Sequence, residues 1–168
     1  MDKMKKFLSG AIVAFVIFAV LFSFTACGED KNEDKYSVKG LMDKVTNSMT
    51  DLPPMLTVSY GDENAESVFS YLSDIDYSKV KDFIFKYSEE GLADEIAIIQ
   101  LKDEADASSV VEELKTRITI RRSTFITYNE SEVMKFNGAK AKNIGNYCIL
   151  IIGNQASNGI YDFEGAFK

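Results

Sequence analysis

Two pairs of apolar segments, separated by one long helical segment, limit most strongly what this chain can fold into. Residues 80–87 and 95–101 form the first pair, and residues 140–144 and 147–152 form the second. A short loop containing Gly joins the members of each pair, as in a β-hairpin. We therefore predict an α+β fold, with a mainly antiparallel sheet of about four strands in two hairpins and helices packed on one face.

The long segment between the hairpins is predicted to be helical, and Asp103 or Asp106 can cap it. Its apolar side consists of Ala107, Val110, Val111, Leu114, Ile118 and Phe125. The β-branched residues within 116–127 would also suit a strand, but the apolar side continues in phase through them. Shorter helical segments are predicted at 38–49, 64–72, 131–136 and 160–167.

The first 26 residues have the order of a lipoprotein signal peptide. Lysines precede an uncharged apolar stretch over residues 7–24, whose length is also close to that of a short membrane-spanning helix. The stretch ends in Phe24-Thr25-Ala26-Cys27, which resembles a lipobox, although Leu is usual at the place of Phe24. The resemblance implies cleavage after Ala26 and a diacylglycerol on Cys27. The alternative is an uncleaved anchor helix with an incidental Cys.

This interpretation divides the chain into a signal peptide (1–26), a lipidated Cys with a tether (27–36) and a single α+β domain (37–168). Residues 28–35 are polar or charged throughout and cannot bury apolar surface, so we expect them to be disordered. The domain is long enough to form a real hydrophobic core. We expect it to lie outside the cell, anchored to the outer face of the membrane by the lipid on Cys27.

The residue types exclude several chemistries. The chain has a net charge of -7, which argues against nucleic acid as a partner. It contains no His, which excludes Ser-His-Asp and Cys-His catalysis and the usual zinc sites. Cys148 lies in an apolar run and is interpreted as a buried small hydrophobe rather than a nucleophile. We expect no cofactor, no metal and no enzymatic activity.

Acidic residues cluster where elements are predicted to end, so we interpret them as caps and turns. The clusters consist of Asp74 and Asp76, of Asp94 and Glu95, and of Asp103, Glu104 and Asp106. The alternative is an exported carboxylate-dependent hydrolase acting on cell-wall material. Such an enzyme requires two carboxylates that converge in one pocket with pKa values pushed apart.

Basic residues gather between positions 115 and 142. The candidate contacts for an anionic surface are Arg117, Arg121, Arg122, Lys140 and Lys142. Arg117 and Arg121 share one side of the predicted helix. The surface could be wall polymer, lipid headgroups or an acidic protein. The alternative is that these side chains form a solvated helix face that pairs with the acidic half of the same domain.

Several short motifs occur in order between residues 93 and 163. They are the strand 94–99, a helix holding Leu114, Arg117 and Ile118, the stretch 128–133 and a strand that begins with Gly145-Asn146-Tyr147. Together they resemble the domain-of-unknown-function 4358 lipoproteins of Gram-positive bacteria. The resemblance implies an exported location and this fold, and it carries no activity.

Three kinds of function remain open. We expect first a membrane-anchored, non-catalytic binding or interaction domain at the cell surface, and second the hydrolase described above. A solute-binding lipoprotein of a transporter ranks last, because such proteins usually have two lobes and this chain is predicted to have one domain.

Overall fold

The computed structural model describes residues 36–168, which form one compact unit. The predicted signal peptide, Cys27 and the tether up to residue 35 lie outside the described residues. Tyr36, which the sequence assigned to the tether, belongs to the domain instead. Its ring centroid lies 4.8 Å from that of Phe167, and its carbonyl accepts a hydrogen bond of 2.8 Å from the Tyr147 hydroxyl.

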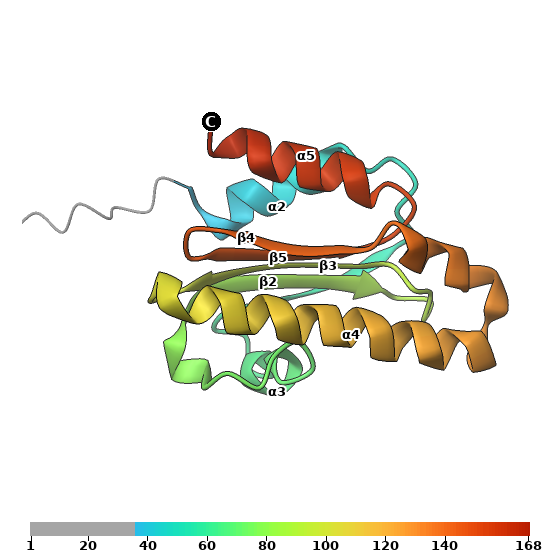
Figure 1. Cartoon of the computed structure of the whole chain (residues 1–168), viewed down its shortest axis with the longest axis horizontal. Coiled ribbons are helices and arrows are strands. Elements are labelled where there is room, and N and C mark those ends of the chain that lie inside the picture. Colours follow the sequence, from blue (N-terminus) through green and yellow to red (C-terminus); the bar gives the residue numbers. More distant parts are fainter. Residues whose placement is uncertain (1–35) are drawn as a thin grey trace, which may run out of the picture. The chain divides into compact units, whose positions relative to one another are not determined.

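Within residues 36–168, five strands form one antiparallel sheet in the order β1-β2-β3-β5-β4 (Figure 1). The strands are β1 (Met55–Ser59), β2 (Val80–Ser88), β3 (Glu95–Leu101), β4 (Lys140–Ile144) and β5 (Tyr147–Ile152). Both predicted hairpins are confirmed, as β2–β3 and β4–β5. Strand β1 is additional to the prediction. It is short, follows two prolines and has two exposed residues, so its apolar signal is weak.

Helices cover both faces of the sheet, whereas the sequence predicted one face. Helices α3 (Ala65–Phe69) and α4 (Ala107–Tyr128) lie on one side, and α2 (Val38–Asn47) and α5 (Ala156–Ala166) lie on the other (Figure 1). The reason is that β3 and β5 are buried at every position. A strand without a polar side needs a cover on each face.

The sheet therefore separates two hydrophobic cores. Ala97, Ile99 and Leu101 of β3 face α3 and α4, and Ile96 and Ile98 face α2 and α5. This alternation follows from the two-residue period of a strand. With both cores inside residues 36–168, this part of the chain has what it requires to fold by itself.

The predicted helices are confirmed, with adjusted ends. Asp103 accepts a hydrogen bond from the Ala105 N–H and begins a 3-10 turn, η2 (Glu104–Asp106), that leads directly into α4. Helix α4 is continuous through residues 116–127. The segment predicted at 131–136 is the 3-10 helix η3 (Glu130–Asn137). No helix in residues 36–168 is long and apolar enough to cross a membrane.

Candidate functional site

Glu95 is the most unusual charged residue of the sheet. It begins β3 and is only 1% exposed. Because it alternates with Ala97 and Ile99, its side chain faces α4 rather than solvent. A carboxylate at such a position needs cationic partners, since burial of an unpaired charge is strongly unfavourable.

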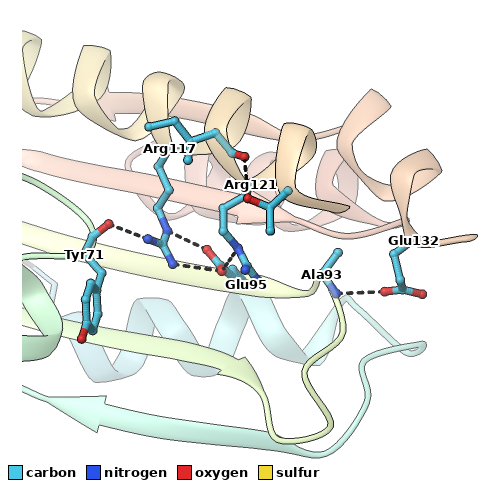
Figure 2. A network of polar contacts seen from close by, with 8 residues as sticks. Tyr71, Ala93, Glu95, Arg117, Arg121 and Glu132 are labelled. Carbon is cyan, nitrogen blue, oxygen red and sulfur yellow. Dashed lines mark hydrogen bonds and ion pairs between the residues drawn. The ribbon is translucent and has the colours of Figure 1, made fainter. Parts of the chain in front are cut away.

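Arg117 of α4 supplies the first partner (Figure 2). Its Nε and Nη2 atoms donate to the two Glu95 carboxylate oxygens, at 2.8 and 3.0 Å. Its Nη1 donates to the Tyr71 carbonyl, and the guanidinium lies over the Phe85 ring at 5.4 Å from the centroid. All three nitrogens are engaged, so Arg117 links α4, β3 and the segment that follows α3.

Arg121 lies one helical turn further along α4 and supplies the second partner. Its Nε lies 2.7 Å from Glu95 Oε1, but the N–H is not aligned for a hydrogen bond, so this contact is an ion pair. The guanidinium lies 4.9 Å from the centroid of the Phe125 ring. No acceptor within residues 36–168 bonds to its Nη1 or Nη2 atoms. Arg121 therefore keeps donors available for a ligand.

A cavity of about 370 Å³, the first cavity, opens beside these two arginines. Its wall is mainly apolar and consists of Leu56, Val68, Tyr71, Phe85, Tyr87 and Leu92, together with Ser88, Glu89 and Gly91 of the β2–β3 turn. A second cavity of about 290 Å³ adjoins it, with Ser70, Leu72, Ser73, Asp74, Glu113, Thr116 and Ile120 in its wall. Tyr71, Arg117 and Arg121 line both cavities.

The charges are arranged with the arginines inside and most carboxylates outside. Two guanidinium groups meet one buried carboxylate, which leaves one positive charge in excess at that point. Glu89 and Asp74, which line the outer parts, are exposed. Glu113 accepts hydrogen bonds from the Ser73 hydroxyl and from the Asp74 N–H. Exposed charges are screened by water and salt, so the arginine pair dominates the interior.

A second buried ionic cluster holds η3 against the start of β3. Lys135 Nζ lies 2.6 Å from Asp94 Oδ2 and 2.9 Å from Glu132 Oε2. Glu132 Oε2 also accepts a 2.9 Å hydrogen bond from the Ala93 N–H (Figure 2). Burial raises the pKa of the Asp94 carboxyl, although Lys135 counteracts it. Burial acts on Glu132 as well, yet the Ala93 N–H and Lys135 lower its pKa. Neither cavity described above is lined by this cluster.

The five basic residues predicted from the sequence do not face one way. Arg117 and Arg121 point inward to Glu95, and Arg122 is exposed on α4. Lys142 pairs with Glu164 of α5, on the opposite face of the sheet, and Lys140 projects to that face because it lies two residues from Lys142. Three of the five therefore pair with acidic residues of the same domain, although Arg117 and Arg121 do so largely out of water and not on a solvated helix face.

Two residues of the other acidic clusters, and Cys148, have structural roles. Asp76 accepts a hydrogen bond from the Ser78 N–H, and Asp106 pairs with Lys79. No group of acidic or Cys side chains in residues 36–168 could hold a metal ion. Cys148 is fully buried, as predicted, and burial raises the pKa of its thiol to about 12.

Sequence reasoning missed most of the first cavity. Glu95 did carry a signal, because it is the one charged residue in phase with the core positions 97, 99 and 101 of the strand. Tyr71 and Leu56 carried none, since exposed aromatic and aliphatic residues are common on protein surfaces.

The chain matches the model of one protein family, described as Domain of unknown function (DUF4358), over residues 57–153. The match spans all five strands except the first two residues of β1, and it contains Glu95, both arginines and the Asp94–Lys135–Glu132 cluster. No curated protein and no solved structure matches the chain. Since the match covers more than half of the 168 residues, the chain belongs to the DUF4358 family.

Proposed function

We propose that this protein is an extracytoplasmic lipoprotein, anchored through a lipid on Cys27, and that its domain is a non-catalytic binding module. The binding site is the first cavity, with Arg121 in its wall. The lipobox-like order Phe24-Thr25-Ala26-Cys27 supports the anchor. Small-molecule sites are concave and mostly apolar with a few fixed polar groups, and the first cavity has these properties.

The observation that carries the proposal is the state of Arg121. Its Nε is held at Glu95 and its guanidinium carbon lies over the Phe125 ring, while Nη1 and Nη2 have no acceptor within residues 36–168. A guanidinium held in this way binds without a large loss of side-chain entropy. The contacts of Glu95 support a binding role of the cavity rather than a catalytic one. Both carboxylate oxygens of Glu95 are occupied by Arg117 and Arg121, so they are not available to transfer a proton to a substrate.

Lipid labelling tests the anchor. Cys27→Ala is expected to abolish the incorporation of lipid and to leave a precursor of unchanged length. Cys148→Ala is the matched control and should retain labelling, because this Cys is buried in the domain. Labelling that persists in the Cys27→Ala protein would contradict the anchor.

Photo-crosslinking in intact cells tests the binding site. A photoreactive residue at position 71, which lines both cavities, is expected to capture a bound molecule. The control is the same residue at position 161, since Tyr161 is also highly exposed but lies on α5, across the sheet. Capture from position 161 as strong as that from position 71 would count against a site at this cavity.

A further inference from the structure

We infer that the ligand of the first cavity is a small amphipathic molecule with one anionic head, which binds Arg121, and an aliphatic part, which lies on the apolar wall. This inference rests on the proposed function and names the class of ligand. It comes from the different states of the two arginines, the uncovered part of the sheet and the positions of the outer carboxylates.

The head group is assigned by comparing the two arginines. Arg117 has Nε and Nη2 on Glu95 and Nη1 on the Tyr71 carbonyl, so it positions Glu95 and has no nitrogen without a partner. Arg121 pairs with Glu95 through Nε, and its Nη1 and Nη2 form no hydrogen bond with an acceptor in residues 36–168. Its two Nη groups can form the parallel pair of hydrogen bonds that an arginine makes with a carboxylate or phosphate. One bound anion would also balance the second guanidinium.

The aliphatic part is assigned from the sheet face that the helices leave open. Helix α4 packs on β4 and β5, and α3 is only five residues long, so the β1–β2 side of this face is incompletely covered. Leu56, opposite Tyr87 in the β1–β2 register, is 42% exposed there, and Tyr71 is 65% exposed. An aliphatic chain bound in the cavity would remove this apolar surface from water.

The outer carboxylates limit the charge of the ligand. Glu89 lies at the turn side of the first cavity, and Asp74 lies in the adjoining second cavity. A polyanion would place its further charges near these carboxylates, and repulsion of that kind gives specificity against it. The cavity volume of about 370 Å³ is near the lower end of the usual range for small-ligand sites. A ligand with a single negative charge and a short aliphatic part is consistent with both the outer carboxylates and the cavity volume.

Calorimetric titration of the domain comprising residues 36–168 tests this inference with four probes: octanoate, acetate, octylammonium and citrate. Octanoate is expected to bind about tenfold or more tightly than each of the others. Arg121→Gln should weaken octanoate binding about tenfold. Arg122→Gln is the matched control, because Arg122 is exposed on the same helix, and it should leave the affinity unchanged.

A second variant tests the aliphatic part of the ligand separately from its anionic head, and it leaves the buried charged residues of the protein unchanged. Leu56→Ser should weaken octanoate binding and leave acetate binding unchanged, whereas Tyr161→Ser should change neither. Circular dichroism on each variant checks that it is folded.

The outcomes distinguish the ligand class from the proposed function. Equal affinities for acetate and octanoate, both lowered by Arg121→Gln, would overturn the amphipathic ligand and leave an anion-binding module. Preference for octylammonium or citrate would overturn the single anionic head. Binding of none of the probes by the folded domain would overturn this ligand class, while the crosslinking at position 71 would still decide whether the cavity binds a partner.

Discussion

Arg117 and Glu95 meet through two hydrogen bonds, of 2.8 and 3.0 Å, that join helix α4 to strand β3. Both side chains are largely removed from water, with 16% and 2% of their surfaces exposed. A buried ion pair of this kind adds little net stability compared with apolar packing, but the loss of one partner leaves an uncompensated charge. The pair therefore sets the position of α4 and makes the site sensitive to changes at either residue.

Glu95→Gln is expected to destabilise the domain by about 3 kcal/mol, because Arg117 and Arg121 would then face each other without a carboxylate. Urea denaturation at pH 7 measures the change. Glu89→Gln, in the same cavity but exposed, is the control and should stay within about 0.5 kcal/mol of the unmodified domain. Equal effects of the two substitutions would show that the buried pairing has no special importance.

Gly159→Ala is expected to destabilise the domain by about 1–3 kcal/mol. A Cβ at this position of α5 would lie 2.6 Å from Ile151 Cδ1 and 3.1 Å from both Met49 Sδ and Val45 Cγ1, so either these buried side chains or α5 itself would have to shift. Thermal or urea unfolding measures this cost.

Gly165→Ala, in the same helix, is the matched control for this substitution. Its Cβ would meet nothing nearer than Lys44 Nζ at 3.8 Å. Since Ala has a higher helix propensity than Gly, stability should be unchanged or rise by up to about 1 kcal/mol. A stabilising Gly159→Ala would refute the tight packing between α5 and the sheet.

The contribution of Glu132 to stability is expected to depend on pH. Burial disfavours its ionised form, but the Ala93 N–H and Lys135 lower the pKa of the carboxyl below its ordinary value of 4.5. The native state therefore binds the proton less readily than the unfolded chain does. The resulting stabilisation is present above pH 4.5 and is lost as the pH falls through the folded-state pKa.

Glu132→Gln should accordingly cost about 2 kcal/mol at pH 7 and progressively less below pH 4.5. Urea denaturation of both proteins across this pH range measures the difference. Glu130→Gln, exposed in the same 3-10 helix, should show a small effect at every pH. A Glu132→Gln effect that is constant with pH would argue against a stabilising ionised carboxylate.

Cys148 is expected to resist thiol reagents in the folded domain. The side chain is fully buried, and burial raises the pKa of the thiol to about 12, so almost no thiolate forms at pH 8. In residues 36–168, where it is the one Cys of the sequence, labelling should occur only on unfolding in guanidinium chloride. Rapid labelling of the native protein at pH 8 would contradict this environment.

The sequence by itself determined the local elements and the fold class. The hairpins β2–β3 and β4–β5 could be predicted because short apolar runs flank a loop that contains Gly, and the long helix α4 because its apolar side recurs with the helical period. Such patterns are local properties of the chain, so they do not depend on which other segment packs against them. For the same reason the burial of Cys148 was predictable from its apolar neighbours.

The tertiary structure alone decided which segments meet. The helical period placed Arg117 and Arg121 on one side of α4, but their pairing with Glu95 depends on that side of α4 lying against the start of β3. The cavity arises because α3 is short and β1 adds an uncovered edge, and Leu56 and Tyr71 become its wall through that arrangement. Long-range contacts of this kind depend on the packing of several elements at once, so the periodicity of a single segment does not predict them.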